Sequence, residues 1–168
     1  MMRDYWKNSR PKYFKQESLF VAKWIETILN QEKDLIIKPL ERVYQAKFPF
    51  SQIKVYMTTI PICPYNYSQR WFMVLKQSKI TSFIKTALHE LNHFMFIYYY
   101  QQKLESKNFN PNHIHFVREA LAILTSWDGV ENDNKPKIQE LQKYIYSLHR
   151  YNIENIIDLA LKQKSLFL

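Results

Sequence analysis

The chain has 168 residues, with 24 lysine and arginine against 15 aspartate and glutamate, and a formal net charge of +9. This length suits one domain spanning residues 1–168 with a substantial hydrophobic core, and no repeat or linker divides it. Gly129 is the only glycine, which excludes the glycine-rich phosphate loops of P-loop and Rossmann proteins and disfavours a turn-rich all-β fold.

Cysteine usage and hydropathy bear on the cellular setting. Cys63 is the only cysteine, so an internal disulfide is excluded and a reducing compartment, the cytoplasm, is expected. No signal peptide is visible, and the apolar run Phe94–Tyr100 is too short to span a bilayer, so we expect no membrane insertion. The basic residues of Arg3–Lys15 interleave with aromatic ones, which would suit nucleic acid, but no nucleic-acid motif accompanies them and a solvated basic surface is favoured.

The first half of the chain predicts two helices followed by two short strands. Residues 17–29 and 35–47 space their apolar side chains as amphipathic helices do. Residues 53–59 alternate apolar and polar side chains, which is typical of a half-buried strand. Residues 70–75 predict a second strand, placed immediately before the next helix.

A helix predicted over Ile80–Tyr98 carries the most informative motif of the chain, His-Glu-Leu-Asn-His from His89 to His93. Histidines four apart on a helix lie about 40° apart around the axis and roughly 6 Å apart along it, so both imidazoles can reach one small metal ion. Glu90 lies at the next position around the helix, where a carboxylate can take a proton from a metal-bound water. Zinc suits two imidazoles and one carboxylate, with a fourth position open for water or substrate.

A third protein ligand has several candidate sources. The metzincin class is excluded, because Phe96 and Tyr99 stand where its motif requires glycine and histidine. Asp128 lies beyond the helix, in a setting typical of a helix end followed by a turn. A glutamate on a second helix is the remaining source, and Glu119 fits it best.

Glu119 belongs to a predicted buried helix that follows the turn at Asn108–Asn112, with Asn112 as its expected cap. A carboxylate on an almost wholly apolar helix is costly unless it is paired or metal-bound. Antiparallel packing of the two helices across the turn would bring Glu119 level with His93, at 1.5 Å of rise per residue. His115, four residues earlier on the same face, is a rival ligand or a partner of the ligand, and a salt bridge from Glu119 is the structural alternative.

His-Glu-x-x-His on one helix, with a Glu-Ala pair on the next, resembles the gluzincin branch of the zincin metallopeptidases. The short connection is similar to the minimal single-domain members of that branch, and the resemblance covers about Gln69 to Trp127. It implies a zincin-like fold in which His89, His93 and Glu119 bind Zn²⁺ and Glu90 is the general base.

The resemblance also bears on the surroundings of the metal. Larger gluzincins carry an aspartate four residues after the ligand glutamate; Ile123 stands there, so Asn92, Thr125 or a backbone carbonyl must orient the ligand histidines. In zincins the strand before the metal helix forms the upper rim of the cleft. As an exposed edge strand it would bind an extended peptide, with contacts from Trp71, Met73 and Val74.

The C-terminal third predicts a helix from Pro136 to Tyr146 or Arg150 and a last helix over residues 153–164. Candidates for a donor to the oxyanion lie here, namely Tyr144, Tyr146, His149, Arg150 and Tyr151. The apolar tail Ser165–Leu168 could cover the cleft, as the C-terminal segments of small relatives do, or pack on the core.

The sequence therefore predicts an α+β domain, with several helices packed on a small mixed sheet, and a monomer. The expected activity is zinc-dependent hydrolysis of a peptide or protein substrate. Two alternatives remain open: a non-catalytic basic binding or regulatory protein that retains a zincin fold, and a zinc hydrolase that acts on a non-peptide amide.

Overall fold

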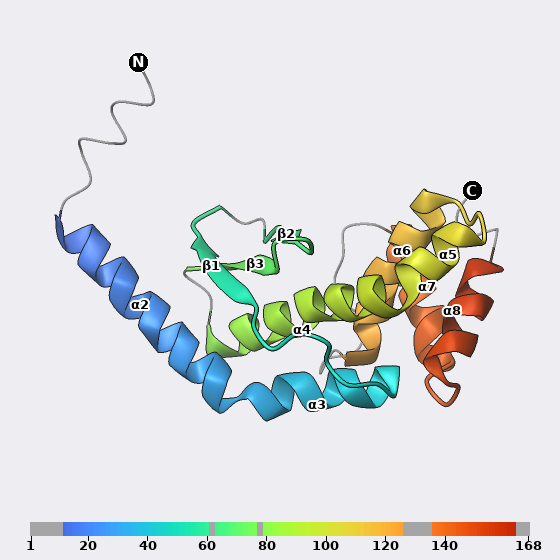
Figure 1. Cartoon of the computed structure of the whole chain (residues 1–168), viewed down its shortest axis with the longest axis horizontal. Coiled ribbons are helices and arrows are strands. Elements are labelled where there is room, and N and C mark those ends of the chain that lie inside the picture. The colour runs from blue at the N-terminus through green and yellow to red at the C-terminus, as the bar shows by residue number, and fades with distance from the viewer. Residues whose placement is uncertain (1–11, 61–62, 77–78, 126–135, 164–168) are drawn as a thin grey trace, which may run out of the picture.

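The computed structural model describes residues 12–60, 63–76, 79–125 and 136–163, and it is an α+β fold (Figure 1). Helices precede and follow a small sheet. In chain order the elements are the helices α2 (Lys12–Gln31) and α3 (Lys33–Tyr44), the strands β1 (Lys54–Thr58), β2 (Tyr65–Asn66) and β3 (Trp71–Leu75), the helix α4 (Ile80–Phe96), the π-helical turn η1 (Ile97–Gln101), the helices α5 (Gln102–Ser106) and α6 (Pro111–Leu121), the 3₁₀ turn η2 (Ala122–Thr125), and the helices α7 (Pro136–Ser147) and α8 (Ile153–Leu161).

Each helix and strand that periodicity predicted is present, with shifted ends. The α2 helix extends beyond the predicted residues 17–29 at both ends, and α3 begins before the predicted residue 35 and contains Pro39 in its interior. The predicted helix over residues 80–98 is divided between α4 and η1. Asn110, not the predicted Asn112, caps α6, because the Asn110 side chain accepts a hydrogen bond of 2.9 Å from the backbone N–H of Asn112.

The sheet has the order β1-β3-β2, with β1 parallel and β2 antiparallel to β3. The strand predicted over residues 70–75 is therefore the central strand, and the expectation that it is an exposed edge is wrong. Its N-terminal half is paired on both sides, since Lys54 lies opposite Trp71 in β1 and Asn66 lies opposite Trp71 in β2. The reason is β2, a strand of two residues that is too short to show any alternation in the sequence.

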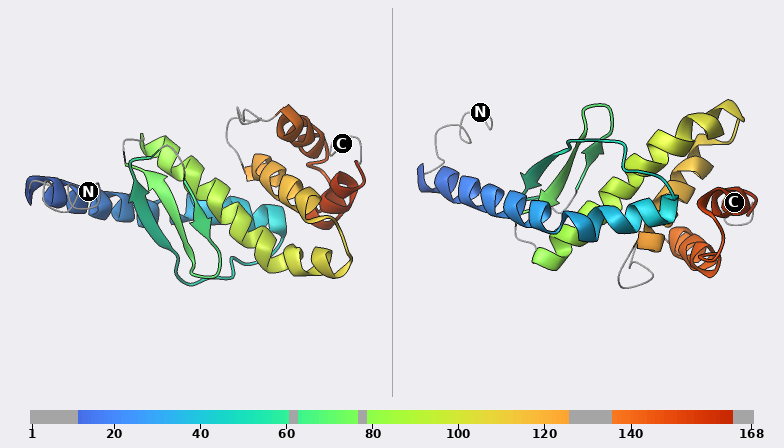
Figure 2. Two further views of the ribbon diagram at one scale, coloured as in Figure 1. Left: turned by 90° about the horizontal axis from the view of Figure 1, so that it is seen from above. Right: turned by 60° about the horizontal axis from the view of Figure 1, so that its bottom comes forward.

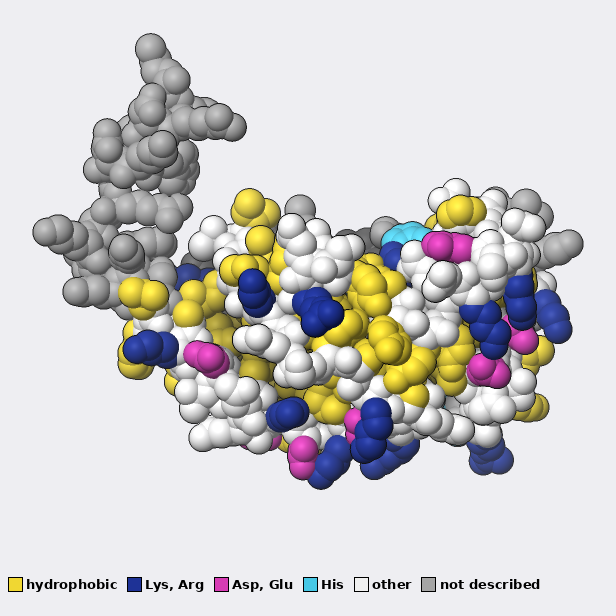
Figure 3. Space-filling model, in the orientation of Figure 1, with side chains coloured by type: hydrophobic (Ala, Val, Ile, Leu, Met, Phe, Trp, Pro, Cys, Tyr) yellow, Lys and Arg dark blue, Asp and Glu magenta, His cyan; other side chains and the backbone are white. Residues whose placement is uncertain are grey.

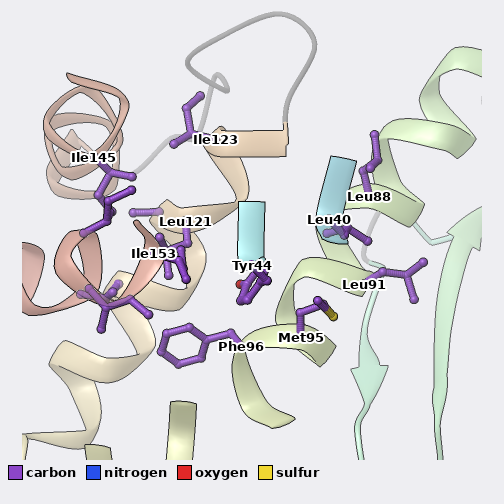
Figure 4. Packing of buried hydrophobic residues seen from close by; sticks show 14 of the residues in the cluster. Leu40, Tyr44, Leu88, Leu91, Met95, Phe96, Leu121, Ile123, Ile145 and Ile153 are labelled. Atoms are coloured by element: carbon purple, nitrogen blue, oxygen red, sulfur yellow. The ribbon is translucent and has the colours of Figure 1, made fainter. Parts of the chain in front are cut away.

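The α4 helix is the centre of the fold. Figure 2 shows the sheet lying against its first half and α6 running beside its second half, with α7 and α8 packed on α6. A continuous hydrophobic core joins α3, α4, α6, η2, α7 and α8, and Figure 4 shows part of it, including Leu40, Tyr44, Leu88, Leu91, Met95, Phe96, Leu121, Ile123, Ile145 and Ile153. Burial of this apolar surface, at about 25 cal/mol per Å², fixes the depth and rotation of α4 and so the direction of its polar side chains.

A buried polar junction holds α4 against its neighbours. The Tyr44 hydroxyl of α3 donates to Asn92 Oδ1 at 2.8 Å, and Asn92 Nδ2 lies 3.5 Å from the carbonyl oxygen of Leu121 and 3.4 Å from Thr125 Oγ1. Asn92 and Thr125 thus hydrogen-bond to each other, and Asn92 also bonds to Tyr44 and to the backbone of Leu121. The expectation that either orients a ligand histidine is replaced by this structural role. Among the described residues, no helix has the length and hydropathy to cross a membrane.

Candidate metal centre

His89 and His93 lie on the side of α4 that faces β2 and α6. The four-residue spacing places their Nε2 atoms 3.0 Å apart, as the helical geometry predicts. The His93 side chain is 2% exposed, whereas His89 is partly open to solvent. One imidazole is thus fixed inside the protein, and the other borders the space from which a ligand or substrate would enter.

The third group comes from α6, which returns antiparallel to α4 after the turn. Pro111 and the Asn110 cap begin α6, and Glu119 lies two turns further along. Glu119 Oε2 is 3.4 Å from His93 Nε2 and 3.7 Å from His89 Nε2. The structure therefore brings together the three residues that the sequence selected, and each offers a ligand atom within 4.8 Å of the others.

These separations suit a tetrahedral zinc ion. Zinc–ligand distances of about 2.0–2.1 Å in a tetrahedron set the ligand atoms roughly 3.3–3.4 Å apart. The observed separations of 3.0, 3.4 and 3.7 Å lie on both sides of that value. Two nitrogen donors and one oxygen donor, with His89 and Glu119 partly exposed, match the donor set of a catalytic zinc site, which keeps its fourth position open.

The protonation states of the three groups also suit a metal. Burial lowers the pKa of His93 to about 4, so its imidazole is neutral at pH 7. Burial opposes ionisation of Glu119, but hydrogen bonds from His89 and His93 hold the pKa of its carboxyl well below the usual range. Neutral imidazole and ionised carboxylate are the forms that bind metal ions.

The second oxygen of Glu119 has partners of its own on α6. Glu119 Oε1 lies 3.5 Å from His115 Nδ1 and 3.7 Å from Arg118 Nη2, and Arg118 Nη2 is 2.8 Å from His115 Nδ1. Among the described residues, the group that could hold a metal ion is His89, His93 and Glu119, and His115 lies outside it. His115 is therefore placed beside the carboxylate that would hold a metal, on the side away from the histidine pair.

Tyr65 is a residue of this site that the sequence did not indicate. Its ring stacks on the His93 ring, with centroids 5.0 Å apart and planes inclined by 32°. The guanidinium of Arg118, on α6, lies 5.8 Å from the centroid of the Tyr65 ring. Burial raises the pKa of Tyr65; the Arg118 charge opposes this, and the Glu119 and Glu90 charges add to it. Tyr65 belongs to β2, the short strand that carries no periodic signal.

Glu90 is buried, with 6% of its surface exposed. Its carboxylate charge raises the pKa of Tyr65 and, after burial, is the next cause of the raised pKa of the Cys63 thiol. The Glu90 charge therefore acts on two residues that lie at or just before β2. Burial of an ionised carboxylate costs free energy of solvation. A glutamate buried next to His89 in the chain therefore favours a functional role beside the histidines.

The other predicted contacts lie elsewhere. Val74 is completely buried, and Trp71 packs edge-on against Tyr56 with its Nε1 donating to Gln69 Oε1 at 2.9 Å. Tyr146 and Tyr151 are exposed, His149 Nδ1 lies 2.8 Å from the carbonyl oxygen of Tyr146, and α7 packs on α6, η2 and α8. Two further candidates, Asp128 and the tail Ser165–Leu168, lie outside the described residues.

Comparison of the chain with protein-family models, curated proteins and solved structures found no match.

The buried imidazole predicts a pH dependence of stability in the metal-free chain. The pKa of His93 is about 4 in the folded chain and 6.5 in an ordinary setting, so between these values the unfolded chain binds a proton that the folded chain does not. The free energy of unfolding should fall by up to about 3 kcal/mol as the pH falls through this window. Urea denaturation of the wild type and of His93→Gln at several pH values measures it, and parallel pH curves for the two proteins would contradict it.

Proposed function

We propose that the chain is a zinc-dependent metallopeptidase of zincin-like fold, with His89, His93 and Glu119 as zinc ligands. The observation that carries the proposal is the meeting of these three side chains, from two helices, at separations that suit tetrahedral zinc. When bound, Zn²⁺ supplies Lewis acidity that lowers the pKa of a coordinated water toward neutrality.

Glu90 is the residue that moves the proton. Its carboxylate accepts a proton from the attacking water and then returns that proton to the nitrogen of the departing amine. Glu90 is buried and follows His89 directly in the chain, which is the position of a general base beside the metal in this motif. A protein that only binds a partner needs no buried glutamate at this position, so the intact Glu90 favours the enzyme over the non-catalytic alternative.

We place the substrate at β2 rather than at β3. Met73 N–H donates to the carbonyl oxygen of Pro64 at 2.9 Å, so alternation along the strand turns the N–H and C=O of Tyr65 away from β3. An extended peptide that pairs with Tyr65 would run past the ring that covers His93. The Tyr65 hydroxyl and the Arg118 guanidinium are the donors that we propose for the carbonyl oxygen under attack, in place of the candidates on and after α7.

The experiment combines metal analysis with digestion of a mixed peptide library. The zinc-loaded chain should cleave peptides, should lose this activity when a chelator removes the metal, and should recover it when one equivalent of zinc is returned. Cleavage that persists in the metal-free chain would contradict a zinc mechanism. If the loaded chain leaves every peptide intact, the proposal of a peptidase is wrong, and non-peptide amides are then the substrates to test.

The proposed setting is the reducing cytoplasm, with the chain as a monomer.

A further inference from the structure

A large groove lies on the opposite side of α4 from the metal centre. Its volume is about 910 Å³, and apolar side chains from α2, α3, β1, β3 and α4 line it, among them Leu29, Ile36, Val55, Phe72, Ala87 and Leu91. On α4, Ala87 and Leu91 are two positions away from His89 and His93, which is roughly 200° around the helix. The groove is therefore separate from the metal centre, and its role does not depend on the function proposed above.

One wall of the groove is the outer edge of the sheet. Among the described residues, β1 pairs with β3 alone. Lys54 N–H donates to the Arg70 carbonyl at 2.9 Å, and the Thr58 carbonyl accepts from Lys76 N–H at 2.8 Å. Because pairing directions alternate along a strand, the backbone groups of Val55 and Met57 point away from β3, toward the open edge.

An open strand edge beside an apolar groove is suited to an extended chain. The edge supplies main-chain hydrogen bonds, and the groove receives the alternate side chains of the added strand. The α2 helix extends the apolar surface, since Leu19 is 56% and Phe20 71% exposed. Figure 3 shows apolar side chains exposed across this face of the molecule, flanked by lysine and arginine.

The charged residues around the groove indicate which kind of partner it binds. The charged residues that line it are Lys23, Lys33 and Lys54 against the single acidic residue Glu26. A second copy of this chain would set the same lysines against one another, in a molecule whose formal net charge is +9. An acidic partner gains attraction from the same lysines. We propose that the outer edge of β1 and this groove bind an extended segment of another protein, with apolar residues at alternate positions and acidic residues at its ends.

Two fluorescein-labelled peptides test this, each with a core of alternating valine and threonine, one flanked by glutamates and the other by lysines. The glutamate-flanked peptide should bind in fluorescence anisotropy at least about tenfold more tightly than the lysine-flanked one. Val55→Pro removes only the outward N–H and blocks the edge, so it should weaken binding at least about tenfold, whereas Val55→Ala should weaken it less. The triple variant Lys23→Glu, Lys33→Glu, Lys54→Glu should reverse the preference between the peptides.

Circular dichroism and thermal melting check that each variant is folded. If Val55→Pro does not fold, the peptide preference of the triple lysine-to-glutamate variant tests the proposal instead. Equal binding of the two peptides, or no binding up to about 1 mM, overturns the proposal. Self-association of the wild type in sedimentation velocity that Val55→Pro abolishes would also overturn it, because the groove would then serve a second copy. None of these readouts requires zinc or activity.

Discussion

Replacement of Glu90 by glutamine is expected to abolish hydrolysis while leaving the fold and the zinc content unchanged. Glutamine keeps the shape of the side chain but cannot accept the proton of the attacking water. Loss of a general base lowers turnover by about 10²–10⁴-fold. Because Glu90 is not one of the three ligands, the zinc stoichiometry of Glu90→Gln should equal that of the wild type.

Turnover and metal content of Glu90→Gln are measured on the same preparation. Glu105→Gln is the matched control, since Glu105 is exposed on α5 and makes a local contact of 2.9 Å to Gln101 Nε2. Its turnover should equal that of the wild type. A Glu90→Gln protein that turns over at the wild-type rate would end the proposed mechanism, and one that has lost its zinc would show that Glu90 acts on the metal instead.

Replacement of Glu119 by alanine is expected to remove high-affinity zinc binding. The change deletes one of the three candidate ligand atoms and leaves only the two imidazoles of His89 and His93 in the group. The affinity should fall by well over about 100-fold, which is the upper end of the loss expected when only a partner of a ligand is removed. Deletion of this half-buried carboxylate also removes the hydrogen bonds that it accepts from His89 and His93.

His115→Ala is the control that separates a ligand from its neighbour. His115 lies 3.5 Å from the other oxygen of Glu119, and its side chain is about half exposed. Its loss should weaken zinc binding by about 10–100-fold at most, through the orientation of Glu119. Full retention of zinc by Glu119→Ala together with its loss in His115→Ala would reverse the two roles.

The grouping of the three candidate ligands was predictable from the sequence because each position is fixed by local geometry. Helical periodicity sets His89 and His93 on one face, and a polar turn between two apolar helices forces α6 to return antiparallel to α4, which brings Glu119 to them. Those two steps require no knowledge of strand order. Their outcome, three donor atoms within 4.8 Å, depends only on spacing along helices and on the length of the connection.

Strand order and the walls of the site were not predictable in the same way. Periodicity finds a strand but not its neighbours, so it predicts β3 as an edge strand, whereas β2, with two residues, lies at that edge. Tyr65 was missed with it, although its ring covers His93. Asn92 was expected to orient a ligand; its actual partner is Tyr44, which is 48 positions away in the chain and meets it only through the packing of α3 on α4.

Zinc titration of the purified chain in competition with a chromophoric chelator tests the central claim most directly. The wild type should bind one zinc ion per chain, His93→Ala and Glu119→Ala should bind none at the same chelator concentration, and His115→Ala should retain one with weakened affinity. A wild type that takes no zinc from the chelator, or a Glu119→Ala variant that binds zinc as tightly as the wild type, would contradict the claim that His89, His93 and Glu119 form a zinc centre.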